Sequence, residues 1–186
     1  ENPKNKSGKS GLWKAHIIFK ITDGESPALK DVTGDGHNDV ITSWDGHGYG
    51  LAWYENKGIQ KDGSVKFTEH VIINSEPEQN PFGVKFSQLH ALDLADIDGD
   101  GLLDIITGKR FWAHGPKGDA EPGAPAVLYW FQLIRKGGKA EYIPHRIDDN
   151  SGVGTQVAAG DVNGDGLLDI VVGNKKGAFV HLHSVK

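Results

Sequence analysis

Acidic side chains recur in three short segments whose spacing suits the binding of a hard metal ion. The segments read DVTGDGHNDVITS from Asp31, DIDGDGLLDIITG from Asp96 and DVNGDGLLDIVVG from Asp161. Their first aspartates are separated twice by 65 residues. Three copies at one interval indicate a repeat array with one supersecondary unit per repeat.

Each segment has oxygen-bearing side chains at positions 1, 3, 5 and 9 and a glycine at position 6. Alternate residues of a tight loop face one hollow, and glycine permits the sharp turn, so oxygen ligands converge as Ca²⁺ requires. A backbone carbonyl at position 7 would add a further ligand. The predicted ligands are Asp31, Thr33, Asp35, His37 and Asp39; Asp96, Asp98, Asp100, Leu102 and Asp104; and Asp161, Asn163, Asp165, Leu167 and Asp169.

The pattern therefore predicts three Ca²⁺ sites of unequal strength. The second, with four carboxylates, should bind most tightly, and the first should bind most weakly because Thr33 offers only a hydroxyl. Ten of the 25 acidic residues lie in these loops, where like charges repel one another without a cation. Three bound Ca²⁺ would change the formal net charge of −5 to about +1.

Two other kinds of loop share part of this pattern. An EF-hand loop ends in a bidentate Glu at position 12 between helices, whereas position 12 here is Thr42, Thr107 or Val172, within β-branched runs typical of strands. The pattern therefore excludes an EF-hand. The loops could also be Asp/Gly turns without a metal, an interpretation that three regular copies make less attractive.

The segments around the loops predict four strands per repeat, which is the composition of a β-propeller blade. A short apolar stretch precedes each loop, and a β-branched run, an aromatic strand and a fourth strand follow it. The fourth-strand pattern also occurs at residues 13–18, whereas the third repeat ends after its third strand. The expected fold is all-β, with three four-stranded antiparallel blades in residues 12–186, strand exchange at the termini and a disordered lead at 1–11.

Composition sets limits on the class of protein. The 186 residues, with 37% hydrophobic and 24% charged side chains, indicate a soluble globular chain without a membrane span. The 26 glycines suit many tight turns, and the absence of cysteine excludes disulfides, thiolate metal sites and a cysteine nucleophile. The excess of acidic over basic residues, 25 against 20, argues against nucleic-acid binding. The start at Glu1 and the lack of methionine predict that a leader or longer N-terminal part has been removed.

The motif D-x-[DN]-x-D-G-x-x-D followed by an apolar strand resembles the FG-GAP/VCBS repeats of integrin α-subunit propellers, bacterial surface proteins and some fungal lectins. The resemblance covers residues 12–186, with a departure at Thr33. It implies a calcium-stabilised β-propeller, usually secreted or on the cell surface and usually of seven blades. The three blades expected in this chain are fewer than the seven that are usual for these propellers.

Two ways of completing the ring remain open. Propellers contain 4–8 blades, so two copies of the chain would give six, with each N-terminal strand completing the last blade of the other copy. This predicts a homodimer formed through the terminal strands. The alternative is that the chain is a piece of a longer propeller.

The long connections are expected on the face opposite the acidic loops, where a glycan or protein ligand could bind. The candidate ligand-binding residues are Trp44, His47, Tyr49, His90, Arg110, Trp112 and His114. The favoured function is an extracellular calcium-binding module for binding or assembly, because extracellular sites saturate at about 10⁻⁴–10⁻³ M Ca²⁺.

Two other functions stay open beside this one. Some propellers resembling this chain are polysaccharide lyases or sugar dehydratases, in which His or Tyr would abstract a proton and Arg110 would stabilise an anion. The chain could also be a structural subunit that polymerises through complementary terminal strands.

Overall fold

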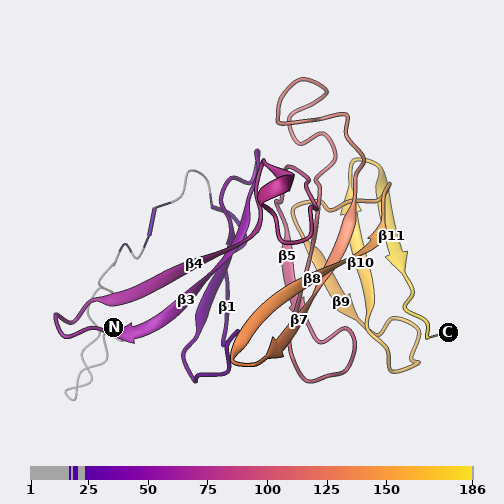
Figure 1. Cartoon of the computed structure of the whole chain (residues 1–186). Helices are drawn as coiled ribbons and strands as arrows, with labels where there is room; N and C mark the ends of the chain where they lie inside the picture. The colour runs from indigo at the N-terminus through magenta and orange to yellow at the C-terminus, as the bar shows by residue number, and fades with distance from the viewer. Residues whose placement is uncertain (1–16, 18, 21–23, 186) are drawn as a thin grey trace, which may run out of the picture.

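The structure is a computed structural model that describes residues 17, 19–20 and 24–185 (Figure 1). The expected disordered lead at 1–11 lies outside the described residues. The expected fourth-strand-like segment at 13–18 also lies outside them, except for Ile17.

The described residues form eleven strands in three antiparallel sheets and one short 3₁₀ helix, η1 (Pro77–Gln79). Sheet I contains β1 (Ala28–Lys30), β2 (Asp39–Ser43), β3 (Leu51–Ile59) and β4 (Val65–Ile73). Sheet II contains β5 (Leu92–Ala95), β6 (Asp104–Gly108), β7 (Leu128–Lys136) and β8 (Lys139–Asp148). Sheet III contains β9 (Val157–Gly160), β10 (Asp169–Asn174) and β11 (Gly177–His181).

Every sheet is an up-and-down meander in which neighbouring strands are also consecutive in sequence. Each acidic loop joins the first two strands of its sheet, as the sequence predicted. The all-β class, the antiparallel pairing and the order of four, four and three strands are therefore confirmed for the described part of the chain. The three sheets of the described residues remain separate and do not form a closed ring.

Local sequence explains why these segments pair as hairpins. Between β7 and β8, Gly137 and Gly138 have φ of 59° and 75°, and Lys136 pairs with Lys139 on either side of them. Two left-handed residues form the two-residue turn whose twist matches that of the flanking strands. The β-branched residues of β2, β6 and β10 lie at the centre of each sheet, where their stiff side chains pack well.

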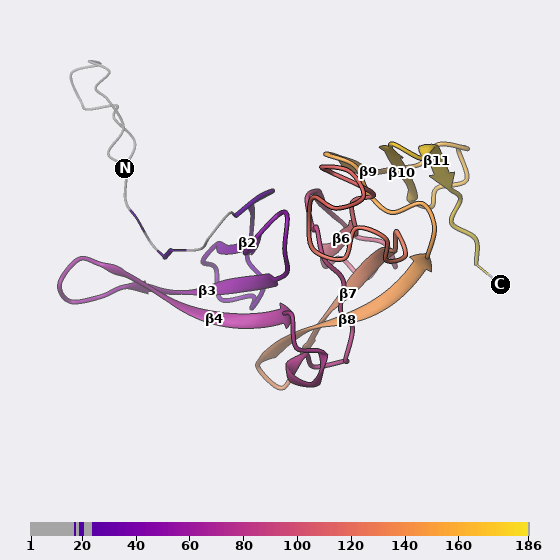
Figure 2. The same ribbon diagram turned by 90° about the horizontal axis from the view of Figure 1, so that it is seen from above.

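Sheet II lies between the other two sheets and packs against both (Figure 2). Successive side chains of a strand point to opposite faces. Accordingly, Ile105 belongs to the cluster shared with sheet I, and Ile106 belongs to the cluster shared with sheet III. The first strands of the sheets are also neighbours, with β5 beside both β1 and β9.

Aromatic side chains of the third strands stack on histidines of the fourth strands. Trp53 lies on His70 with ring centroids 4.0 Å apart, and Trp130 lies on His145 at 4.5 Å. Both pairs occupy directly opposed positions of the antiparallel ladder. These histidines therefore take part in the packing of their sheets.

Phe131 offers a test of this packing, because its side chain is only 1% exposed within the cluster between sheets I and II. We expect Phe131→Ala to lower the free energy of unfolding by about 3–5 kcal/mol through lost burial and a residual cavity. The measurement is urea denaturation followed by tryptophan fluorescence.

The matched control is Phe82→Ala, since Phe82 is 43% exposed. Its expected effect is within about 0.5 kcal/mol of the parent chain. Equal effects of the two substitutions would contradict the described core.

Candidate functional site

The first aspartate of each acidic loop organises the turn around its own carboxylate. Asp31 accepts hydrogen bonds from the N–H groups of Gly34 at 2.6 Å and Gly36 at 2.9 Å. Both glycines have φ near 85°, a left-handed conformation that L side chains rarely adopt. The same contacts link Asp96 with Gly99 and Gly101, and Asp161 with Gly164 and Gly166.

The ninth residue of each loop is a fully buried aspartate. In sheets I and II it joins the loop to the third strand, and in sheet III it joins the loop to His183, just after the third strand. Asp104 accepts the N–H of Ile97 at 3.0 Å with one oxygen and the N–H of Leu133 at 2.8 Å with the other. Equivalent bonds join Asp39 to Val32 and Asn56, and Asp169 to Val162 and His183. Sequence reasoning assigned these residues only as metal ligands and missed their structural contacts.

The environment of Asp104 disfavours a negative charge. Burial, together with the charges of Asp98 and Asp100, raises the pKa of its carboxyl to about 6, against the hydrogen bonds from Leu133 and Ile97, which lower it. A divalent cation in the loop would oppose this effect, because an opposite charge nearby favours the ionised form of an acid.

The second loop brings its acids closest together. Asp96, Asp98 and Asp104 each offer a carboxylate oxygen, and these oxygens lie within 4.8 Å of one another. Among the described residues, neither of the other two acidic loops forms such a group of three carboxylates. This loop is also the one for which the sequence predicted the tightest binding.

A positively charged side chain from the neighbouring sheet lies against the first loop. The Arg135 guanidinium, from β7 of sheet II, donates to the backbone oxygen of Val32 at 2.8 Å and to that of Asp31. Burial raises the pKa of Asp31, but hydrogen bonds from Gly36, Gly34 and Asp35, together with the Arg135 charge, lower it below its usual value. A fixed positive charge beside the loop disfavours a bound metal ion.

On the long connections between strands, three of the predicted ligand-binding residues come together. The His47 ring centroid lies 5.2 Å from that of His90 and 4.6 Å from that of His114. Two carboxylates that sequence reasoning missed join them. Glu25 contacts His90 at 2.6 Å and His47 at 3.7 Å, and Asp119 contacts His47 at 3.4 Å.

Asp119 is the most buried carboxylate of this histidine cluster, with 4% of its side chain exposed. It accepts the backbone N–H of His114 at 3.0 Å and pairs with the Nδ1 atom of the same residue at 2.9 Å. Burial raises the pKa of Asp119, but the hydrogen bonds from His114 and the charges of His114 and His47 lower it below the usual value.

A buried lysine lies close to this group. Lys109 is 1% exposed, and its ammonium group lies 3.4 Å from the backbone oxygen of Arg110. Burial lowers its pKa, whereas the charges of Glu121 and Asp119 raise it. The connection between β6 and β7 therefore carries charge into a region shielded from water.

The other predicted ligand-binding residues make different contacts. The Trp44 indole donates to the Tyr54 hydroxyl at 2.9 Å and thus packs on sheet I. The Tyr49 ring lies under the Lys85 ammonium at 4.9 Å. Arg110 donates its backbone N–H to the carbonyl of Gln88. The Trp112 ring stacks on Phe111, and the Trp112 carbonyl accepts a hydrogen bond from the Lys175 ammonium.

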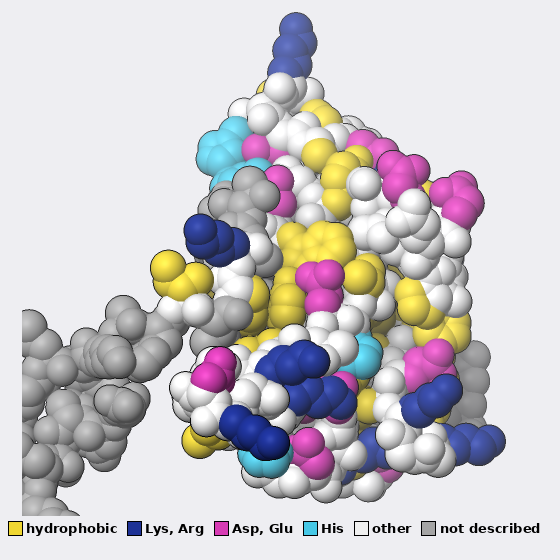
Figure 3. Space-filling view, turned by 60° about the vertical axis from the view of Figure 1, so that its left-hand side comes forward, with side chains coloured by type: hydrophobic (Ala, Val, Ile, Leu, Met, Phe, Trp, Pro, Cys, Tyr) yellow, Lys and Arg dark blue, Asp and Glu magenta, His cyan; other side chains and the backbone are white. Residues whose placement is uncertain are grey.

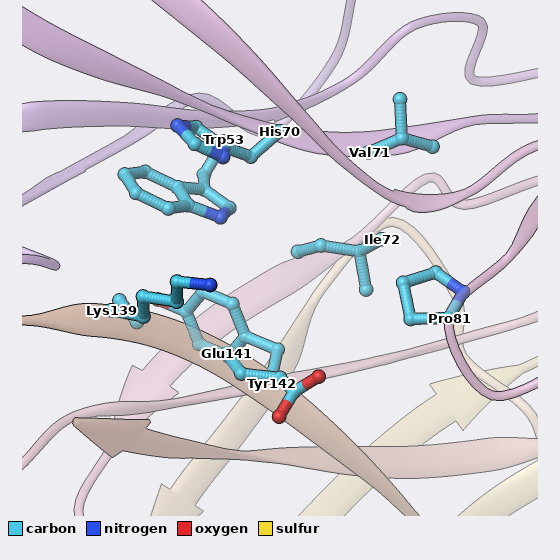
Figure 4. Close-up of a pocket in the computed structure, with 9 residues that line it drawn as sticks. Trp53, His70, Val71, Ile72, Pro81, Lys139, Glu141 and Tyr142 are labelled. Atoms are coloured by element: carbon cyan, nitrogen blue, oxygen red, sulfur yellow. The ribbon is translucent and has the colours of Figure 1, made fainter. Parts of the chain in front are cut away.

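A cavity of about 270 Å³ lies between sheets I and II and is lined mainly by residues of β3, β4 and β8. Its wall includes the stacked rings of Trp53 and His70, with Lys139 and Tyr142 across from them (Figure 4). The space-filling view shows hydrophobic side chains in a hollow of one face, with Lys and Arg side chains beside it (Figure 3). The cavity lining combines these stacked aromatic rings with the titratable side chains of Lys139 and Glu141.

Comparison with protein families identifies the repeats. The FG-GAP-like repeat profile matches residues 31–107, which include the first two acidic loops, and the FG-GAP repeat profile matches residues 153–179, which include the third. The chain therefore contains FG-GAP and FG-GAP-like repeats, as the resemblance in its sequence indicated. A search of curated proteins gives no match.

One sequence signal could have revealed Glu25. Glu25 and His90 are 65 residues apart, the interval of the repeat, and each lies just before the first strand of its sheet. The two positions are therefore equivalent in neighbouring repeats. Asp119 lies in a connection that has no counterpart of similar length, so no repeat signal pointed to it.

Asp104→Asn tests whether the ninth residue holds the loop independently of any metal. We expect a loss of about 1–3 kcal/mol in the free energy of unfolding at pH 7 with a chelator present, because the amide NH₂ would face a backbone donor and leave it unpaired. Chemical denaturation measures the loss.

Asp100→Asn is the control, since Asp100 lies in the same loop and accepts the N–H of Leu102 at an exposed position. Its expected effect is within about 0.5 kcal/mol. A loss as large as that of Asp104→Asn would show that the two aspartates do not differ in structural role.

Proposed function

We propose that the chain is a calcium-binding, propeller-type module that acts outside the cell in binding or assembly. The observation that carries this proposal is the second acidic loop, where three carboxylate oxygens lie within 4.8 Å of one another. Hard oxygen ligands in a turn held by left-handed glycines suit Ca²⁺, which accepts irregular coordination by six to eight oxygens.

The hydrogen bonds within the loops support the same proposal. Asp96 is held by the N–H groups of Gly99 and Gly101, so its carboxylate is already oriented before a cation arrives. A carboxylate has about four lone-pair positions and keeps acceptor capacity after two such bonds. The third loop has the same backbone arrangement around Asp161, whereas Arg135 makes the first loop the poorest site.

An extracellular or cell-surface location agrees with the repeats. FG-GAP repeats are typical of extracellular or cell-surface proteins. No helix in the described part of the chain is long and apolar enough to span a bilayer. Calcium sites of extracellular modules bind at about 10⁻⁴–10⁻³ M, which matches the concentration outside cells.

Self-association is the form of assembly that the sheets favour. Val171 and Val180 lie opposite each other on β10 and β11 and are 36% and 51% exposed. In sheet III, β11 is an edge strand within the described residues, whereas the corresponding third strands of sheets I and II pair with a fourth. An apolar edge strand invites a strand from another chain, and two copies would make six sheets, within the range of closed propellers.

Calcium titration of thermal unfolding tests the metal proposal. At 1 mM Ca²⁺ a site with a Kd of about 10⁻⁴ M adds about 1.4 kcal/mol to the free energy of unfolding. We expect Ca²⁺ to raise the unfolding temperature and Asp98→Ala to remove a large part of that increase.

The control is Asp149→Ala, which removes an exposed acid outside the three loops. This variant should respond to Ca²⁺ as the parent chain does. A parent chain whose stability does not change with Ca²⁺, or a control that responds as weakly as Asp98→Ala, would contradict the proposal.

Light scattering tests the assembly proposal. We expect a mass of about 40 kDa in millimolar Ca²⁺, twice the 20.1 kDa of one chain, and a lower mass after chelation. Val180→Lys should favour the single chain, because it places a charge in the apolar edge. Ile59→Lys, at a position 79% exposed in sheet I, is the control. A mass near 20 kDa under all conditions would overturn the dimer.

A further inference from the structure

We propose that Glu25, His47 and His90 form a binding site for one divalent transition-metal ion, separate from the acidic loops. Each of the three offers a ligand atom, and these atoms lie within 4.8 Å of one another. Glu25 lies before β1, His47 lies in the connection between β2 and β3, and His90 lies before β5. The site therefore joins sheet I to sheet II.

The ligand chemistry differs from that of the acidic loops. Imidazole nitrogen suits Zn²⁺, Fe²⁺ and related ions, whereas Ca²⁺ takes oxygen ligands. Two histidines and one carboxylate are a common set of three protein ligands for such ions, and they leave coordination positions open to water or a substrate. A transition-metal ion would thus bind at Glu25, His47 and His90, whereas Ca²⁺ would bind at the acidic loops.

The contacts indicate which atoms would bind. The Glu25 carboxylate lies 2.6 Å from His90 Nδ1 through one oxygen and 3.7 Å from His47 Nε2 through the other. The side chains of Glu25, His47 and His90 are 21%, 31% and 16% exposed. The three groups are therefore shielded yet still reachable from solvent.

Asp119 completes the arrangement from the far side of the His47 ring. Its carboxylate lies 3.4 Å from His47 Nδ1, on the other side of the ring from Glu25. At this distance Asp119 is an ion-pair partner of His47 rather than a hydrogen-bond partner of its Nδ1. A small approach of the carboxylate to Nδ1 on metal binding would fix the tautomer and direct the lone pair of Nε2 to the metal. Asp119 is held in turn by two contacts with His114, so we assign it as a positioning residue.

The backbone around Glu25 is held in place by sheet I. Its N–H donates to the Ser43 hydroxyl at 3.1 Å, and its carbonyl accepts from the Thr42 hydroxyl at 3.0 Å. The Glu25 carboxyl group lies against Gly46, where an added Cβ would come within 2.5 Å of it. Glycine at 46 therefore leaves the space that the Glu25 side chain occupies.

The segments that carry the two histidines are joined to each other as well. Asp45 accepts the N–H of His47 at 2.9 Å, and Gln88 donates its N–H to the carbonyl of Gly48 at 2.7 Å. The Ser26 hydroxyl donates to the carbonyl of His90 at 2.8 Å. Such contacts limit the motion of the three ligands relative to one another, which lowers the entropic cost of binding a metal.

Zinc titration of the full chain by calorimetry tests the inference. The chain is first treated with a chelator and then kept in millimolar Ca²⁺, so that oxygen sites do not contribute to the Zn²⁺ signal. We expect one equivalent of Zn²⁺ to bind. Co²⁺ serves as a second probe, because its visible spectrum reports nitrogen ligands and coordination number.

The Zn²⁺ affinity of substituted chains shows which residues bind the metal. Glu25→Gln, which preserves side-chain shape, and His90→Ala should each weaken Zn²⁺ binding more than about 100-fold, beyond the 10–100-fold typical of an outer-shell partner. Asp119→Asn should weaken it about 10–100-fold. His145→Gln is the control, since His145 stacks on Trp130 in sheet II, and it should bind Zn²⁺ as the parent chain does.

Three results would overturn the inference. The first is the absence of a Zn²⁺ equivalent in the parent chain, which would leave the cluster as a set of histidine–carboxylate ion pairs. The second is unchanged Zn²⁺ affinity in Glu25→Gln together with its loss in His114→Ala, which would move the metal to another set of ligands. The third is an equal loss in His145→Gln. Circular dichroism spectra of each variant separate loss of a ligand from loss of the fold.

Discussion

The buried aspartate at the ninth position of each acidic loop is the contact on which the three sheets depend. In sheet II, Asp104 joins the N–H of Ile97 in the loop to the N–H of Leu133 in the third strand, and Asp39 makes the same bridge in sheet I. In sheet III the equivalent bonds of Asp169 reach the loop and the segment just after the third strand. A buried carboxylate that accepts two backbone donors satisfies groups that would otherwise be costly to bury. The loop, the second strand and the third strand are therefore fixed as one unit.

Burying the aspartate of this bridge disfavours its negative charge, and a nearby positive charge would offset that effect. Burial and the neighbouring acids raise the pKa of Asp104 to about 6, so its ionised form is disfavoured in the folded chain. The proposed Ca²⁺ would relieve the repulsion in the second loop, whereas Arg135 supplies a positive charge to the first loop from the neighbouring sheet. Two loops of nearly the same sequence can thus differ in their need for a metal.

The long connections place a second kind of chemistry beside this scaffold. Glu25 and His90 are equivalent positions of neighbouring repeats, and the packing of sheet I on sheet II brings them to 2.6 Å. His47 and Asp119 come from connections that differ between repeats. The repeated part of the chain thus supplies a rigid base, and the connections supply the groups that make the histidine cluster distinct.

The sequence by itself determined the repeat, the strand order and the acidic loops, because these depend on local patterns: β-branched runs form strands, and Asp with Gly at regular spacing forms a tight turn. It also predicted that His47, His90 and His114 would share the face opposite the acidic loops. Only the tertiary structure decided that Glu25 and Asp119 join them, that Arg135 reaches the first loop and that Asp104 bridges two strands. Those contacts join residues distant in the chain, and their geometry arises from how the sheets pack, which no local pattern encodes.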